Sequence, residues 1–283
     1  MEQAIRRFLT YLETDQGRAA NTILAYRADL NQFARVVAMQ AGSGATPGDL
    51  TPTAIAAFVH WLEGQGYRPA TLSRKMAAAR SFLDYLGSHE IALNPALAAE
   101  LHAPTAPRHP PRILAQDEVA ALLAAAGKSG TARGLRDSAI LSLLYSTGLR
   151  ATDLVGLRLD DVDTDQGTVH RAGRPEAPLA MGMAAAPVRE YVKHGRPHLA
   201  HGPEERALFL NQRGQELSRQ GLWLVVKRWS AACGLGIDVS PHSLRHSMAH
   251  HLLDQGRSRR EVQQLLGLSS PSAIRVRRGT GAG

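Results

Sequence analysis

Apolar residues recur at helical spacing through the first hundred residues of the chain. The pattern runs through Ile5–Leu12, Ile23–Val37, Ile55–Leu62 and Leu72–Leu86, with apolar side chains three or four positions apart. This spacing places them on one face of a helix. The first hundred residues therefore predict four amphipathic helices, and they show no strand pattern.

The ends of these helices are marked by residues that suit a helix start. Asn21 and Thr51 are the candidate N-caps, because their side-chain oxygens can accept hydrogen bonds from backbone N–H groups of the first turn. Pro52 follows Thr51 at a first-turn position, where its missing N–H costs nothing.

A proline-rich segment, His102–Arg112, separates two parts of the chain. It has four prolines in eleven residues, which prevents regular structure and favours an extended connection. We therefore expect a helical domain at 1–101, a linker at 102–112 and a second domain at 113–283.

The second domain is predicted to be mainly helical with a small β-sheet. The expected helices cover residues 117–126, 135–146, 183–194, 218–232, 241–254 and 258–266. The sheet is expected between the second and third of these helices. Gly167 marks a turn there, and Val169 and Leu179 are its strand residues.

Charge and composition point to a polyanionic partner. The chain carries 33 Lys and Arg against 25 Asp and Glu, a formal charge of +8, so nucleic acid is the first candidate. The single cysteine, Cys233, excludes a disulfide framework and a cysteine-based zinc site. No apolar run reaches the length of a membrane span, and no secretory signal begins the chain, so we expect a cytoplasmic protein.

The stretch SPHSLRHSMAHHLL brings four of the 12 histidines together with one arginine. Ser240 is a candidate N-cap and Pro241 fits the first turn, so His242 and Arg245 lie three apart near a helix N-terminus. A phosphate could be held there by Arg245 and the free N–H groups of the helix, while His242 exchanges a proton.

Two other interpretations of the same histidines remain. His242, His246 and His250 are four residues apart, so two of them could ligate a metal ion, but no third ligand is evident and the HExxH pattern is absent. Alternatively, His246, His250 and His251 form a partly solvated or hydrogen-bonded helix face.

A second arginine follows a predicted helix end in STGLRATDL. Gly148 is a natural C-terminal stop, Arg150 lies in the turn before the next helix, and Asp153 is one turn further on as a possible buttress. Taken alone, an arginine at this position is more often a partner of the negative end of the helix dipole than a catalytic group.

Taken together, STGLRATDL, PHSLRHSMAHHLLDQG and EVQQLLG resemble the tyrosine recombinase (phage integrase) family, in particular its Xer-type members. NTILAYRADLNQFARVV resembles the family's core-binding, SAM-like domain, and ILAQDEVAALLAAA resembles the opening of its catalytic domain. The resemblance implies two domains that clamp double-stranded DNA, in a homo- or hetero-tetramer that pairs two sites.

The resemblance also implies roles for residues of this chain. Arg150 and Arg245 would hold the scissile phosphate, and His242 of the HxxR motif would be a proton-transfer partner. Family members break and rejoin DNA through a covalent 3′-phosphotyrosine, which conserves the bond energy, so no cofactor or metal ion is expected.

The chain departs from the family pattern at three points. Leu268 stands where a histidine or tryptophan is expected, and Arg277 where the nucleophilic tyrosine is expected. All six tyrosines precede the HxxR motif. The β-hairpin lysine of the family is also missing; the nearest cations are Arg171 and Arg174, which we expect to contact phosphate but hardly to donate a proton.

Three hypotheses follow from these departures. The reading frame was shifted or truncated near Gly267, or the chain is a non-cleaving DNA-binding relative. A third hypothesis, from another class, is a helix-turn-helix regulator that reads DNA with the region Ser258–Ser270, but it gives Arg150, His242 and Arg245 no role.

Overall fold

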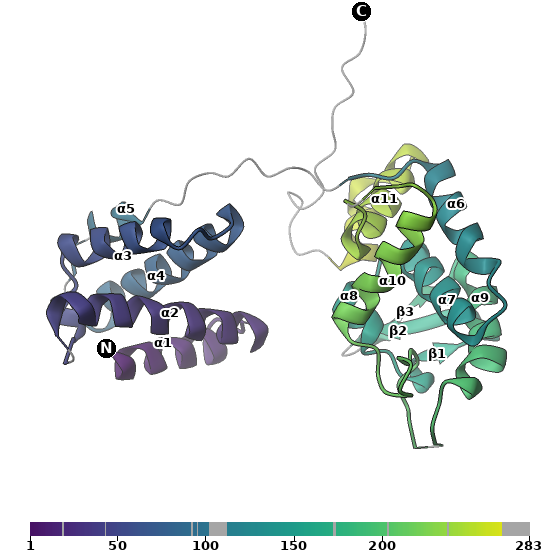
Figure 1. Ribbon diagram of the computed structural model, residues 1–283, viewed down its shortest axis with the longest axis horizontal. Coiled ribbons are helices and arrows are strands. Elements are labelled where there is room, and N and C mark those ends of the chain that lie inside the picture. Colours follow the sequence, from purple (N-terminus) through teal and green to yellow (C-terminus); the bar gives the residue numbers. More distant parts are fainter. Residues whose placement is uncertain are drawn as a thin grey trace, which may run out of the picture. The chain divides into compact units, whose positions relative to one another are not determined.

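The computed structural model describes residues 1–267 except 19, 43, 92, 95, 102–111, 172, 173, 203 and 237. The chain divides into two units, Met1–His109 and Pro110–Gly283 (Figure 1). The expected linker at 102–112, except Arg112, lies outside the described residues, as do Leu268 and Arg277.

The first unit is built from the four helices that the apolar spacing predicts and one more. They are α1 (Glu2–Thr14), α2 (Ala20–Ala41), α3 (Pro52–Gly64), α4 (Pro69–His89) and the short α5 (Ala96–Glu100). Their apolar faces meet in one core, whose largest fully buried side chains are Phe8, Phe33, Phe58 and Phe82. The described part of this unit contains no strand.

The helix starts in this unit confirm one expected cap and correct the other. Thr51 accepts a hydrogen bond from the N–H of Ala54 at 3.2 Å, and Pro52 occupies the first turn of α3. Asn21 is not an N-cap, because α2 already begins at Ala20 and Asn21 lies inside the helix.

The second unit is mainly helical, and its helices lie around a small sheet (Figure 1). Its helices are α6 (Gln116–Gly127), α7 (Ala132–Thr147), α8 (Ala151–Val155), α9 (Ala185–Glu190), α10 (Arg219–Ala232), α11 (Pro241–Asp254) and α12 (Arg259–Leu266). The middle of α7 is buried on all sides, from Arg136 to Leu144, so this helix forms the centre of the core.

The sheet has three antiparallel strands in the order β1 (Val162–Asp163), β2 (Thr168–Arg171) and β3 (Arg174–Ala180). The two expected strand residues, Val169 and Leu179, lie in β2 and β3 and pair with each other, and Gly167 adopts a positive φ of 67° in the turn before β2. At the far end of the hairpin, Arg171 pairs with Arg174.

The helix expected over 183–194 is interrupted in the structure. A 3₁₀ turn at Gly182–Ala184 precedes α9, and a wider π-helical turn, Tyr191–Gly195, follows it. The π turn begins at Tyr191, whose fully buried ring stacks on Phe209 with 5.6 Å between ring centroids. Tertiary packing therefore changes the type of helix at a point that apolar spacing does not mark.

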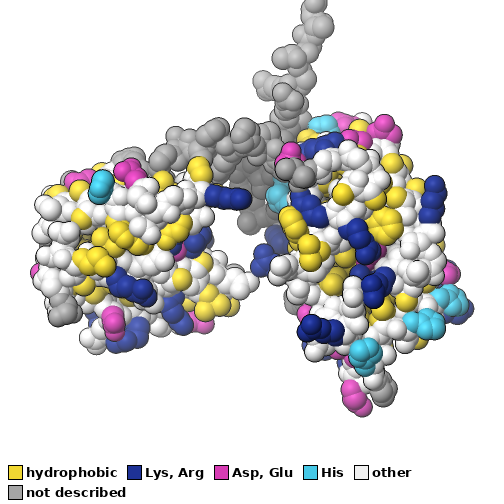
Figure 2. Space-filling view, viewed as in Figure 1, with side chains coloured by type: hydrophobic (Ala, Val, Ile, Leu, Met, Phe, Trp, Pro, Cys, Tyr) yellow, Lys and Arg dark blue, Asp and Glu magenta, His cyan; other side chains and the backbone are white. Residues whose placement is uncertain are grey.

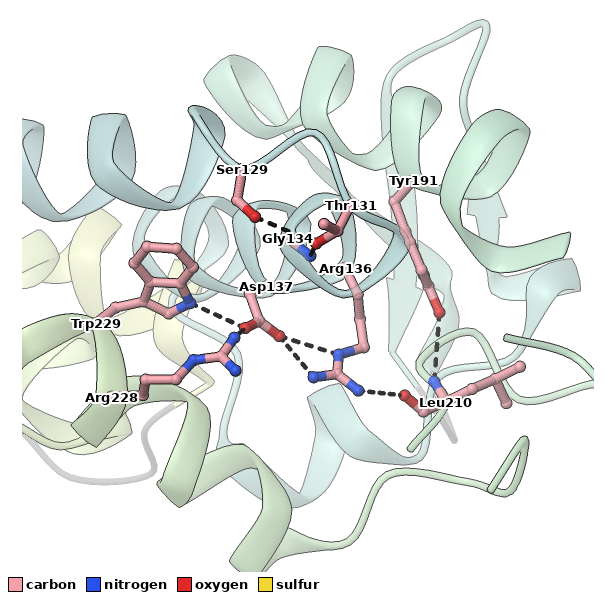
Figure 3. Close-up of polar contacts among 9 residues, drawn as sticks. All are labelled: Ser129, Thr131, Gly134, Arg136, Asp137, Tyr191, Leu210, Arg228 and Trp229. Carbon is pink, nitrogen blue, oxygen red and sulfur yellow. Dashed lines mark hydrogen bonds and ion pairs between the residues drawn. The ribbon is translucent and has the colours of Figure 1, made fainter. Parts of the chain in front are cut away.

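A buried carboxylate links the central helix to α10. Asp137 of α7 is fully buried and accepts hydrogen bonds from the Arg136 guanidinium at 2.8 and 3.0 Å, from the Trp229 indole at 2.9 Å and from Arg228 (Figure 3). Arg136 also donates to the carbonyl of Leu210 at 2.8 Å. The carboxylate is thus fully compensated, which is the condition under which a charge is tolerated in a core.

Replacing Asp137 with alanine leaves the buried Arg136 guanidinium without its carboxylate. We expect Asp137→Ala to lower the free energy of unfolding by about 3–5 kcal/mol, which urea denaturation followed by circular dichroism would measure. The control is Asp160→Ala, which removes an exposed ion pair with Arg206 at 2.9 Å and should cost less than about 1 kcal/mol. Equal losses in the two variants would show that the buried network is not a stabilising link.

Candidate functional site

The site is assembled from two helix junctions and a strand end. Gly148 ends α7 in the left-handed conformation (φ 60°), so the chain turns sharply and Arg150 becomes the N-cap residue of α8. Ser240 caps α11 by accepting a hydrogen bond from the N–H of Ser243 at 3.2 Å, and Pro241 lies in the first turn. These two local structures, both predicted from the sequence, fix the backbone positions of Arg150, His242 and Arg245.

Arg245 lies at the centre of the site, and the residue is only 8% exposed. It donates to the carbonyl of Gly148, at the end of α7, and to the carbonyl of Leu266 at 2.6 Å. Burial, together with the nearby cations Arg150 and Arg171, lowers the pKa of Arg245 to about 10, and Asp153 opposes this shift. Arg245 remains charged at neutral pH, although the positive charges of Arg150 and Arg171 are nearby.

Two more arginines point to the same helix end. Arg150 donates to the carbonyl of Gly267 at 3.2 Å, and Arg171, at the end of β2, donates to the carbonyl of Leu265 at 2.5 Å. The three guanidiniums therefore bind the carbonyls of three successive residues, 265–267, where α12 ends. We call this group of Arg150, Arg171 and Arg245 the arginine cluster.

One carboxylate of the described residues, Asp153, lies near the arginine cluster. Asp153 approaches Arg150 at 4.0 Å, which is the limit of an ion pair, and the Arg150 side chain is 53% exposed. The carbonyls at a helix C-terminus carry only partial negative charge. Among the described residues of the site, positive charges therefore outnumber negative ones, and a phosphate group would be attracted to them.

His242 lies in the first turn of α11, one turn before His246. Their Nε2 atoms are 2.8 Å apart, and the rings meet edge to face with centroids 4.2 Å apart. Burial and the charge of Arg245 lower the pKa of His242. Burial, His242 and Arg245 lower the pKa of His246 to about 4, so both rings are neutral at pH 7.

The other two histidines of the stretch have partners away from the cluster. His250 contacts Asp254 at 2.9 Å, and His251 is buried with its Nδ1 atom 2.8 Å from the Tyr145 hydroxyl. Among the described residues, no group of three or more His, Cys, Asp or Glu side chains is arranged to hold a metal ion. The geometry of α11 favours the interpretation of His250 and His251 as a hydrogen-bonded helix face.

The structure brings together four of the five candidate residues: Arg150, Arg171, His242 and Arg245. Arg174 has a described backbone, in β3, but its side chain lies outside the described part of the chain. Sequence reasoning missed the carbonyls of residues 265–267 as the common partner of the arginines. It noted the spacing of His242 and His246 but not that the two rings would bond to each other.

The tyrosines of the second unit are occupied by structural contacts. Tyr191 is fully buried, its hydroxyl accepts a hydrogen bond from the N–H of Leu210 at 3.3 Å, and burial raises its pKa to about 12. Tyr145 is held by His251, and burial raises its pKa as well. Neither hydroxyl has the properties of an activated nucleophile.

Comparison with known proteins covers almost the whole chain. Residues 112–277 match the model of the phage integrase family, and residues 5–90 match the phage integrase N-terminal SAM-like domain. The chain is 37% identical to tyrosine recombinase XerC of Herpetosiphon aurantiacus, over 98% of this chain and 90% of the relative. It is 36% identical to tyrosine recombinase XerD of Listeria monocytogenes, over 98% and 93%.

Solved structures share the fold. XerH site-specific recombinase bound to its difH substrate superposes with a TM-score of 0.68 at 18% identity, covering 95% of this chain and 80% of that one. A lambda integrase dimer bound to a core site gives 0.65 at 18% identity, covering 100% and 98%. XerA recombinase gives 0.51 at 24% identity, covering 96% and 91%.

The close packing at Gly148 gives a test of how the arginine cluster is held together. A Cβ atom at Gly148 would lie 2.4 Å from the Met248 methyl and 2.7 Å from Leu266 Cδ2, in a left-handed conformation that alanine adopts poorly. We expect Gly148→Ala to lower the free energy of unfolding by about 2 kcal/mol, as measured by urea denaturation.

Gly234 supplies the matched control for this substitution. It has a similar φ of 68° but nothing within 4 Å of the added Cβ, so Gly234→Ala should show only the backbone cost of about 1 kcal/mol. If the two variants lose the same stability, the contact of Gly148 with Met248 and Leu266 is too loose to position the end of α12.

Proposed function

Because the chain belongs to the phage integrase family of tyrosine recombinases and is similar to its Xer-type members, we propose that it acts in site-specific DNA recombination. We propose further that Arg150 and Arg245 hold the scissile phosphate and that His242 is their proton-transfer partner. The observation that carries the proposal is the convergence of three guanidiniums on one helix end, beside the N-terminus of α11.

The chemistry of a phosphodiester fits this arrangement. Negative charge on the nonbridging oxygens grows as the phosphorus is attacked, and guanidiniums held in advance stabilise that charge without reorganising. His242 lies in the first turn of α11, where the positive end of the helix dipole also favours an anion. The side chain of Arg150 is exposed, so it can contact DNA at the protein surface. Arg245 is buried and would contact the same phosphate from its position inside the protein.

The surface charge supports a DNA partner. The chain carries a formal charge of +8, and the face of the second unit in Figure 2 has several Lys and Arg side chains in its middle, while most visible Asp and Glu lie near its margin. The solved XerH and lambda integrase structures are described as bound to DNA sites, and the latter as a dimer. We propose that this chain likewise binds a duplex site, and that two paired sites hold a homo- or hetero-tetramer.

The location of the protein follows from the proposed substrate. None of the described helices combines the length and the apolar character that crossing a bilayer requires. Chromosomal or phage DNA as a substrate would place the chain in the cytoplasm.

Strand cleavage is proposed to be impaired in this chain. All six tyrosines of the printed sequence precede His242, and the two in the second unit are engaged with Leu210 and His251. The second candidate function is therefore a non-cleaving relative that binds DNA and assembles with active partners. Arg171, in place of the family's hairpin lysine, would stabilise charge on the phosphate but would be a poor proton donor.

Salt-dependent DNA binding tests the phosphate contact. Each neutralised phosphate releases counterions, so binding should weaken steeply between low and moderate salt. We expect Arg150→Gln to weaken binding and to reduce the slope of log affinity against log salt by about one, as measured by fluorescence anisotropy with a labelled duplex. The matched control is Arg206→Gln, whose guanidinium is exposed and paired with Asp160, and which should leave the slope unchanged.

The outcome also separates the candidate functions. A helix-turn-helix regulator that reads DNA with Ser258–Ser270 should lose little affinity on Arg150→Gln, so an unchanged affinity and slope would count against the phosphate contact.

Covalent trapping tests the impairment. With a nicked duplex that prevents rejoining, we expect no protein–DNA adduct on a denaturing gel, whereas the XerC relative run in parallel should form one. An adduct of this chain would show that it supplies its own nucleophile, and mass spectrometry would identify the residue.

A further inference from the structure

The contact between His242 and His246 constrains where their protons lie. The two Nε2 atoms are 2.8 Å apart, which is hydrogen-bond distance, so one nitrogen carries a proton and the other offers its lone pair. Two protonated nitrogens at this distance would clash, and two bare lone pairs would repel each other. The protonation of one ring is therefore tied to that of the other.

Both rings are neutral at pH 7, so each carries a single N–H. Burial, His242 and Arg245 lower the pKa of His246 to about 4, and burial and Arg245 lower that of His242. Arg245 is itself influenced by Arg150 and Asp153 of α8 and by Arg171 of β2, so the surroundings are positive overall. For two neutral rings, the direction of one hydrogen bond decides the tautomer of both.

The two possible directions have different consequences for an anion. If His242 donates to His246, its other nitrogen, Nδ1, is a bare lone pair that repels a phosphate oxygen. If His246 donates, Nδ1 of His242 carries the proton and can donate it in a hydrogen bond. Within the described part of the chain, the bond to His246 is the hydrogen bond that His242 makes, which leaves Nδ1 available for a ligand.

We propose that His246 is a positioning residue for His242: it donates its Nε2–H to Nε2 of His242 and so keeps the proton of that neutral ring on Nδ1, directed to a phosphate oxygen. This inference rests on the proposed function, because it takes the ligand of His242 to be the scissile phosphate. It assigns His246 a role that depends on hydrogen bonding rather than on metal ligation or on packing alone.

The position of His246 suits this role. It lies one helical turn from His242 on α11, and it is partly buried beside Arg245, which is itself fixed by the carbonyls of Gly148 and Leu266. An i, i+4 pair on a rigid, capped helix loses little freedom on forming its hydrogen bond. His246 thus holds the His242 ring in one orientation before DNA arrives.

Nuclear magnetic resonance of the full chain labelled with ¹⁵N-histidine tests the proposal directly. Long-range ¹H–¹⁵N correlation spectra at neutral pH distinguish protonated from unprotonated ring nitrogens, and the loss of signals in His242→Asn assigns that ring. We expect His242 to be protonated on Nδ1 alone. In His246→Ala we expect a mixture of both tautomers and a pKa of His242 that rises, because a hydrogen bond that favours the neutral ring is lost.

Two further variants separate hydrogen bonding from packing. His246→Gln retains an N–H donor of similar reach and should restore the single Nδ1–H tautomer that His246→Ala loses. His250→Ala removes a histidine one turn further along α11, where it contacts Asp254 instead, and should leave the His242 signals unchanged. Either a wild-type His242 protonated on Nε2, or a tautomer unaffected by His246→Ala, would overturn the proposal.

The same spectra recorded with duplex DNA distinguish this inference from the proposed function. If the protein binds DNA but the His242 signals do not change, His242 is not at the phosphate and the proposed role of His242 fails. If the His242 signals change equally in the wild type and in His246→Ala, His242 lies at the phosphate but His246 does not position the His242 ring.

Discussion

The site depends on one buried guanidinium. Arg245 joins the carbonyl at the end of α7 to the carbonyl of Leu266 at the end of α12, while its own backbone belongs to α11. The end of α7 and two consecutive helices that follow it about a hundred residues later, α11 and α12, thus meet on one side chain. Burying a charge is costly unless it is hydrogen-bonded, and here backbone carbonyls at two helix ends supply the acceptors. Because those carbonyls are held by helix geometry, Arg245 is fixed in place.

Two helix termini with opposite polarity frame the arginine cluster. The negative end of α12 attracts Arg150, Arg171 and Arg245, and the positive end of α11 lies beside His242. The carbonyls at the end of α12 bring three positively charged guanidiniums together. The positive end of α11 favours an anion beside these guanidiniums. The carbonyls offset only part of the repulsion between the guanidiniums, and in the proposed function a bound phosphate would offset the remainder.

The buried charges in the core of the second unit are arranged differently from those of the arginine cluster. The Asp137 carboxylate accepts hydrogen bonds from Arg136, Arg228 and the Trp229 indole, so every formal charge in this network has a partner (Figure 3). The network joins α7 to α10. At the arginine cluster, Asp153 lies 4.0 Å from Arg150, which is the limit of an ion pair. The compensated network stabilises the fold, whereas we propose that the arginine cluster binds an anionic ligand. α7 contributes to both the network and the cluster. Asp137 lies in its first half, and the carbonyl of Gly148, its C-cap residue, accepts a hydrogen bond from Arg245.

The sequence by itself determined the local elements and the candidate residues. Apolar spacing located the helices, Thr51 and Ser240 were recognisable as caps, Gly148 as a helix stop and Val169 and Leu179 as strand residues, because such signals act over a few residues. Only the tertiary structure decided that α2 begins before Asn21, that a π turn starts at Tyr191 and that three arginines share the end of α12. It also decided that His242 and His246, whose spacing alone would also have allowed a shared metal ion, bond to each other. Contacts such as that between Arg245 and Gly148 join residues about a hundred positions apart, and their formation depends on how whole helices pack, which no local pattern records.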